Sequence, residues 1–195
     1  MSTLDSTQWT HRRYCTAFAL NVEQYGEILV AQAFNGQKHG DAQPCFDVSA
    51  DVANFRVWLA AGGISQALIA ATMPSAPLDG KVRIEVKSKL RFAESGEASV
   101  IHCSDTKLND LTRGEGTKAK TFRAMTHLAV VLVEPETFEI AGAWLLTHAA
   151  VIRLRKDATA SKYVPVESVR KDPDRTGIIE ITTLLQRVAD APLGA

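Results

Sequence analysis

The chain has 195 residues, of which 46% are hydrophobic and 23% are charged, and its 22 basic and 22 acidic residues cancel. This composition is typical of a globular protein with a core, and it argues against a disordered or fibrous chain and against a surface that is basic or acidic as a whole. Three widely spaced cysteines fit neither a disulfide framework nor a zinc knuckle, and no stretch has the apolar length of a signal peptide or membrane helix, so the sequence predicts a cytoplasmic protein with no membrane contact.

The first half of the chain predicts strands followed by a helix. Residues 1–10 are polar and predict a flexible arm in front of a single domain that spans 11–195. Residues 14–34 are rich in β-branched and aromatic side chains and predict two strands, or one long strand bent at Gly26.

A turn at 35–41 leads to an alternating stretch that predicts a strand ending near Asp51. Residues 53–73 exchange strand formers for alanine and leucine at helical spacing. They predict a helical segment that is interrupted at Gly62-Gly63.

The stretch KVRIEVKSKLRF, residues 81–92, alternates between apolar and charged side chains. Because side chains alternate across a strand, the even-numbered residues predict a core face and the odd-numbered residues a solvated, mostly basic face. Residues 97–104, EASVIHCS, predict a hairpin partner for this strand.

The second half of the chain predicts a long loop and then further strands. Residues 104–121 are rich in Gly, Thr and Lys and predict a polar loop, and a loop of this length is more often functional or disordered than without a role. Two apolar strands follow within 122–156, joined by a turn around Pro135 and bent at Gly142, and 178–190 predicts a short strand or a closing helix. The sequence therefore predicts an α+β fold with a mainly antiparallel sheet or a barrel.

The order of these elements is similar to that of the oligonucleotide-binding (OB) barrel, in which a helix bridges the third and fourth strands. Residues 81–92, followed by an acidic glycine turn, resemble the fourth strand of bacterial single-stranded-DNA-binding proteins. The resemblance covers residues 25–105. It implies an OB-like part over 11–105, with additional strands and a tail over 106–195, and a non-enzymatic protein that binds single-stranded nucleic acid.

Charge is segregated along the chain, with ten Lys or Arg residues against six acidic residues between Lys81 and Arg123. A groove that follows a phosphate backbone needs such a surplus, together with rings on which bases stack. The nucleic-acid-binding residues predicted on this ground are Arg83, Lys87, Lys89, Arg91, Arg113, Lys118, Lys120, Phe122 and Arg123. Tyr25 and Phe34, on the strands presumed to face them, are further candidates for stacking.

Other interpretations of the same residues stay open. Lysines on an exposed strand also keep its edge from pairing with another chain, and a polar loop is by itself typical of a solvated linker. A second hypothesis is a protein–protein interaction module: a homo-oligomer, or a subunit, inhibitor or accessory protein of a nucleic-acid-processing assembly or mobile element. It would dock through the apolar strands 125–154 and through the N-terminal arm with Trp9, Arg12 and Arg13.

Patterns for catalysis and for cofactors are weak. A small hydrolase using His102 or His127 is a third hypothesis, but neither histidine has an adjacent acid to orient it. Residues 172–182, DPDRTGIIEIT, begin like the metal-dependent nuclease pattern of restriction-enzyme type, which also needs an acid and a lysine two residues apart. No lysine follows Lys171, so the pattern fails there, and the sequence predicts no catalytic residue, metal site or cofactor.

Overall fold

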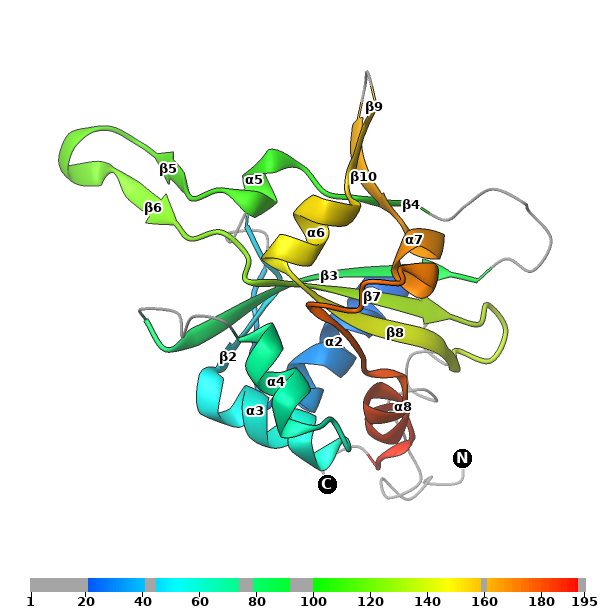
Figure 1. The fold of residues 1–195 in the computed structure, drawn as a ribbon. Coiled ribbons are helices and arrows are strands. Elements are labelled where there is room, and N and C mark those ends of the chain that lie inside the picture. The colour runs from blue at the N-terminus through cyan, green and yellow to red at the C-terminus, as the bar shows by residue number, and fades with distance from the viewer. Residues whose placement is uncertain (1–20, 41–44, 74–78, 92–99, 159–160, 193–195) are drawn as a thin grey trace, which may run out of the picture.

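The computed structural model describes residues 21–40, 45–73, 79–91, 100–158 and 161–192. The predicted arm, together with Trp9, Arg12 and Arg13, lies outside these residues. Over the described residues the fold is α+β, as predicted, and is built on a six-stranded mixed sheet with helices on both sides (Figure 1). None of the described helices is long and apolar enough to cross a membrane.

The sheet is open rather than closed. In spatial order its strands are β1 (Gln37–Lys38), β2 (Val48–Asp51), β3 (Lys81–Leu90), β7 (His127–Val133), β8 (Ile140–Thr147) and β11 (Ile178–Glu180). Strands β3 and β7 are parallel, and the other neighbouring strands are antiparallel. Because the described sheet ends at β1 and β11 without closing on itself, the alternative of an OB-like barrel is wrong for this part of the chain, whereas the mainly antiparallel sheet is confirmed.

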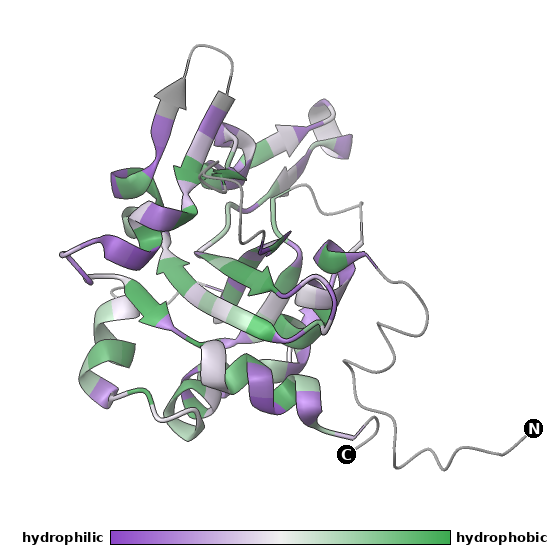
Figure 2. Cartoon of the chain, turned by 90° about the vertical axis from the view of Figure 1, so that its right-hand side faces the viewer, coloured by the Kyte–Doolittle hydropathy of each residue, from purple (hydrophilic) through white to green (hydrophobic). Residues whose placement is uncertain are grey.

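Each face of the sheet is covered by its own layer (Figure 1). One face packs against the helices α2 (Val22–Ala33), α3 (Val52–Ala61), α4 (Gln66–Thr72) and α8 (Thr182–Asp190). The other face packs against α5 (Asp105–Leu108), α6 (His148–Leu154), α7 (Val166–Lys171) and a small sheet of β4 (Val100–His102), β10 (Ser161–Pro165) and β9 (Lys156–Ala158). Figure 2 shows the resulting concentration of hydrophobic residues along the central strands.

A hairpin stands apart from these layers. It consists of β5 (Leu111–Arg113), the 3₁₀ turn η2 (Gly116–Lys118) and β6 (Lys120–Phe122), and it projects away from the body of the molecule (Figure 1). The hairpin is part of the crossover connection between the parallel strands β3 and β7.

Several predicted elements are confirmed. The helical segment is present as α3 and α4, separated at Gly62-Gly63, where Gly63 adopts φ +87°. The strand ending at Asp51, the strand from Lys81 and the two apolar strands are also present. The predicted bend at Gly142 coincides with a register shift opposite Leu132 and Val133. At the C-terminus both alternatives occur, a short strand followed by a helix.

The predicted strand over 14–34 is wrong where the structure describes it, because Val22–Ala33 is the helix α2. The side chain of Asn21 caps this helix by accepting a hydrogen bond of 2.8 Å from the backbone N–H of Gln24. Tyr25 and Leu29, one helical turn apart, are both fully buried. This helical spacing outweighs the strand preference of the aromatic and β-branched residues.

Three predictions downstream are also wrong. Strand β4 does not pair with β3 but with β10, because both neighbouring positions of β3 are taken by β2 and β7. The polar stretch 104–121 is not a plain loop, since it contains α5 and the hairpin. The second apolar strand ends at Thr147, whose side chain accepts a hydrogen bond from Ala150 and starts α6.

Gly26 allows α2 to lie directly on β3. A Cβ atom at this position would be 1.8 Å from Oγ of Ser88, so any larger residue forces the helix or the strand to move. We expect Gly26→Ala to lower the free energy of unfolding by about 1–3 kcal/mol, measured by denaturant titration, although alanine is the better helix former. Gly40→Ala is the matched control, because a Cβ there meets nothing within 4 Å. Equal stability of the two variants would contradict the close packing of α2.

Candidate active site

The odd-numbered face of β3 is not the solvated face that its charges predict. Glu85 is only 1% exposed, and Lys87 is half-buried beside it. The strand lies inside the sheet, and this face is covered by the layer that contains Cys45, Cys103 and Leu108. The prediction of a wet basic face is therefore wrong around Glu85, since both faces of an interior strand are packed.

The site begins where β2 and β3 separate. Their pairing ends at Val48 and Ile84, and the residue before β2, Asp47, still donates its backbone N–H to the carbonyl of Ile84 at 3.0 Å. The carboxylate of Asp47 then accepts a hydrogen bond of 2.8 Å from the backbone N–H of Val86. A side chain thus replaces the missing strand partner, and this bond fixes the Asp47 carboxylate next to Glu85.

Glu85 holds one ammonium group on each carboxylate oxygen. Its Oε1 lies 2.8 Å from Nζ of Lys87, and its Oε2 accepts a hydrogen bond of 2.8 Å from Nζ of Lys107 on α5. Burial raises the pKa of Glu85 and Asp47 raises it further, against the opposing effect of the two lysines. Burial acts to lower the pKa of Lys87, but Glu85, with smaller contributions from Asp47 and Glu23, outweighs it and raises that pKa.

Helix α2 contributes the last charged group of the site. The contact of Gly26 with Ser88 places the first turn of α2 beside β3, one residue from Lys87. Glu23 lies in that first turn, is exposed, and is near enough to Lys87 to act on its pKa. Asp47, Glu85 and Lys87 therefore lie together at the fork between β2 and β3, with Glu23 near enough to act on Lys87, and we call these four residues the fork site.

The fork site fits a magnesium ion better than a zinc ion. Among the described residues no three His, Cys, Asp or Glu side chains form a group that could hold a metal unaided. Mg²⁺ does not need such a cage, because it keeps several waters and is bound through one or two carboxylates and the phosphates of a substrate. Asp47 and Glu85 supply two carboxylates. Oε1 of Glu85 is buried, and within the described residues its polar contact is the ion pair with Lys87, so a metal ion at this oxygen would have to share it with that ammonium group.

The predicted basic residues do not gather in one track. Four of them are neutralised within the chain, through the ion pairs Arg83–Asp79, Lys87–Glu85, Arg91–Glu134 and Arg123–Asp110. Lys89 is half-buried on β3 and forms no ion pair with a described residue. Arg113, Lys118 and Lys120 are exposed on the projecting hairpin, where Nζ of Lys120 lies 5.0 Å from the centre of the Phe122 ring.

The rings proposed for base stacking are not accessible. Tyr25 and Phe34 are both 0% exposed and belong to the core beneath α2 and α3. Their assignment as stacking residues is therefore wrong, because it depended on a strand in place of α2. Of the predicted rings only Phe122, half-buried at the base of the hairpin, has a surface to offer.

Most of the residues expected to serve the other two hypotheses, a docking module and a small hydrolase, are placed inside the fold. Strand β7 is buried along its whole length and β8 nearly so, so the apolar side chains expected to dock a partner are covered by the chain itself. His127 is 3% exposed, its Nε2 donates to the carbonyl of Thr72 at 3.2 Å, and burial lowers its pKa to about 4. His102 is exposed on β4.

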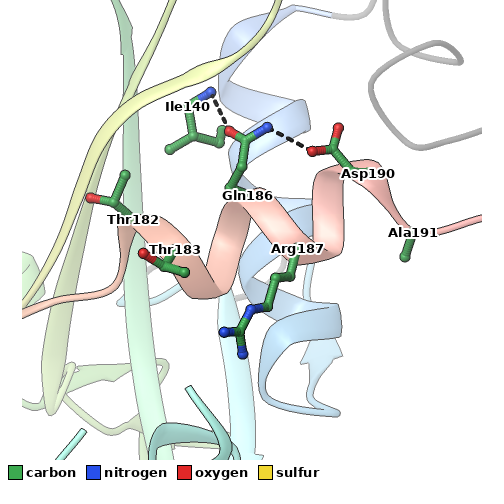
Figure 3. A pocket seen from close by; sticks show the side chains of 7 residues that line it. All are labelled: Ile140, Thr182, Thr183, Gln186, Arg187, Asp190 and Ala191. Atoms are coloured by element: carbon green, nitrogen blue, oxygen red, sulfur yellow. Dashed lines mark hydrogen bonds between the residues drawn. The ribbon is translucent and has the colours of Figure 1, made fainter. Parts of the chain in front are cut away.

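A shallow pocket along α8 contains neither the fork-site residues nor the residues predicted to bind nucleic acid. It is lined by Ile140, Thr182, Thr183, Gln186, Arg187, Asp190 and Ala191 (Figure 3). Gln186 is engaged at both ends of its amide, since it accepts from the backbone N–H of Ile140 and donates to Asp190. The bond to Ile140 attaches α8 to β8, and the bond to Asp190 lies within α8, so Gln186 has a structural role in this pocket.

Sequence reasoning missed the central pair of the fork site although its signal was present. Glu85 and Lys87 are an acid and a lysine two residues apart on a strand, which is the element that the nuclease pattern lacked after Asp174. The preceding acid is Asp47, which follows Phe46 rather than a proline. The nuclease pattern opens with Pro-Asp, which occurs near the C-terminus and not before β3, so the pattern did not indicate Glu85 and Lys87.

Comparison with known proteins adds no assignment: no family model matches the chain, and no curated protein is significantly similar to it.

Proposed function

We propose that this protein is a Mg²⁺-dependent phosphodiester hydrolase that acts on nucleic acid at the fork site. The observation that carries the proposal is the convergence of Asp47 with Glu85 and Lys87 where β2 leaves β3. Two fixed carboxylates next to a lysine suit phosphodiester hydrolysis. The two carboxylates can hold a divalent cation, and the ammonium group of the lysine can contact the phosphate. The non-enzymatic function predicted from the sequence is thereby replaced as the leading proposal.

The residues have separate tasks in this reaction. Asp47 and Glu85 would hold the ion, since the Asp47 carboxylate is fixed by the backbone N–H of Val86 and Glu85 is buried under the surrounding layer. A bound Mg²⁺ lowers the pKa of a coordinated water and neutralises charge on the phosphate. Lys87 places its ammonium group on the phosphoryl oxygens as negative charge develops there. Water adds to phosphorus, one P–O ester bond breaks, and the products are a phosphomonoester and a free hydroxyl.

Lys107 competes with a metal ion for Glu85, because its ammonium group occupies Oε2. We expect Lys107→Met to bind Mg²⁺ or Mn²⁺ several-fold more tightly at pH 8, since the dication no longer displaces a charge from a buried carboxylate. Calorimetric titration measures this. Lys171→Met, which removes a surface lysine paired with Glu167, is the control. Unchanged or weaker metal binding by Lys107→Met would show that Lys107 does not occupy the metal position.

The proposal is tested by incubating the protein with labelled DNA and RNA, single- and double-stranded, with Mg²⁺ or with a chelator. We expect cleavage that requires the metal and leaves a phosphate on one side of each break. Intact nucleic acid under every metal condition, with a folded protein that binds no Mg²⁺, would refute it.

A second candidate function is the binding of nucleic acid without cleavage. It is favoured by Arg113 and Lys118, which lie exposed on the hairpin without an ion pair to a described residue. On that proposal Lys120, Phe122 and Arg123, which belong to the hairpin or follow it directly, would add to the same surface, whereas Lys89 lies apart from it on β3, and the ligand would be the single strand predicted from the sequence. Salt-dependent binding that persists in the complete absence of metal-dependent cleavage would support this candidate over the first.

A further inference from the structure

The hairpin Leu111–Phe122 has the form of a recognition arm rather than of a core element. Residues 112–121 are all exposed, and no residue of its 3₁₀ turn is buried. The tip is formed through Gly114 and Gly116, both at positive φ, of +87° and +54°. A Cβ at Gly114 would be 2.8 Å from the carbonyl of Lys118, so the tight turn requires glycine there.

The base of the hairpin is fastened next to the fork site. The carboxylate of Asp110 accepts a hydrogen bond of 2.8 Å from the backbone N–H of Ala124 and forms an ion pair with Arg123. On the other side Nε of Arg83 on β3 donates to the carbonyl of Ala124 at 2.7 Å. The backbone N–H of Met125 donates to the carbonyl of Lys107, whose side chain contacts Glu85. The arm therefore starts from the residues that surround the buried carboxylate.

The charges on the arm point to an anionic ligand. Arg113 and Lys120 are direct cross-strand partners in the hairpin register. Like charges opposite each other destabilise a hairpin, so this pair is a local cost that an external anion would relieve. Lys118 adds a third cation at the turn, against one acid, Glu115.

From these features we propose that the hairpin enters the major groove of double-stranded DNA and selects the duplex as the substrate of the fork site, an inference that rests on the proposed function. The major groove of B-form DNA admits a two-stranded β-ribbon, whereas the major groove of A-form RNA is too narrow for side chains to read. Binding to single strands relies on several stacked aromatic rings, and because Tyr25 and Phe34 are buried, Phe122 alone of the predicted rings remains for stacking. The duplex replaces the single strand that the sequence predicts.

The test separates binding from cleavage by using the full chain with Glu85→Gln as the background. Fluorescence anisotropy measures its affinity for a labelled DNA duplex, for one strand alone and for the corresponding RNA duplex. Adding Arg113→Ala and Lys118→Ala is expected to weaken duplex DNA binding about tenfold and to reduce the salt dependence, as for the loss of two phosphate contacts. Arg170→Ala with Lys171→Ala removes the same charge from α7 and serves as the matched control.

The outcomes for the two proposals are distinguishable. Hairpin variants that bind duplex DNA as tightly as their background, or a background that prefers the single strand or the RNA duplex, would overturn the inference. In the chain that keeps Glu85, the hairpin substitutions should impair the cleavage of duplex DNA. If cleavage is unaffected by them, the role of the hairpin is overturned while the proposed hydrolase stands. Hairpin-dependent binding of duplex DNA with no metal-dependent cleavage would support the arm and refute the hydrolase.

Discussion

Lys87→Ala is expected to lower kcat for Mg²⁺-dependent cleavage by about 10²- to 10⁴-fold, while Lys89→Ala leaves it close to wild type. Both lysines lie on the same face of β3, two residues apart, and only Lys87 contacts Glu85. The two variants therefore lose the same charge from the same strand, and on the proposed mechanism only Lys87→Ala loses it beside the reacting phosphate. Steady-state cleavage assays at saturating Mg²⁺ give the comparison.

Glu85→Gln and Asp47→Asn extend this test to the metal. Each preserves shape while removing a charged oxygen, so metal affinity and cleavage should fall together, and circular dichroism should show an intact fold. Asn at position 47 can still accept the hydrogen bond from Val86. If Lys87→Ala and Lys89→Ala were equally active, or if cleavage survived Glu85→Gln, the buried charges would serve stability alone.

The free energy of unfolding should fall by about 3 kcal/mol between pH 6.5 and pH 4 because of His127. This side chain is buried between β7 and α4, where its ring contacts Phe55 at 5.1 Å between centroids and its Nε2 meets the carbonyl of Thr72. Burial lowers its pKa in the folded chain to about 4, from the ordinary 6.5. The unfolded chain therefore takes up the proton first, and the stabilisation that is complete above pH 6.5 is lost as the pH falls towards 4.

Denaturant titrations across this pH range measure the effect. His127→Gln keeps a donor for the carbonyl of Thr72 but has no proton to gain, so the difference in stability from wild type should shrink steadily on acidification. His102→Gln, at an exposed position on β4, should follow the wild-type curve. Parallel curves for wild type and His127→Gln would mean that the buried ring is charged in the folded protein, or that it is not buried in solution.

The elements of the sheet were predictable where one local pattern dominates. Alternation indicated β3, alanine and leucine at helical spacing indicated α3 and α4, and apolar runs indicated β7 and β8. Helix α2 was missed because Tyr25, Leu29 and their neighbours also suit a strand, and the decisive fact, the close contact of Gly26 with Ser88, involves residues far apart in the sequence. Local preference and tertiary packing disagree there, and packing decides.

The candidate site was predictable only in part. Glu85 and Lys87 could be read as a pair, but alternation assigned both to a solvated face. Both residues are covered by a layer formed by residues 100–108 and 148–171. No local sequence pattern predicts that this layer packs over β3. Asp47 joins them because β2 and β3 diverge after Val48 and Ile84, and the end of a strand pairing is not visible in the sequence. Arg113, Lys118 and Lys120 were predicted to bind nucleic acid from a loop; they are exposed, but on a hairpin, and their role in binding stays a prediction.

The parallel pairing of β3 and β7 obliges the chain to travel from one end of the sheet back to the other. This route carries α5, with Lys107, and the β5–β6 hairpin, and the hairpin itself packs little against the sheet. Its length and charges are therefore free to vary while the strands that hold Glu85 and Asp47 stay unchanged. On the proposed function, exchange of this one insert offers a route by which the same sheet would acquire a different target preference.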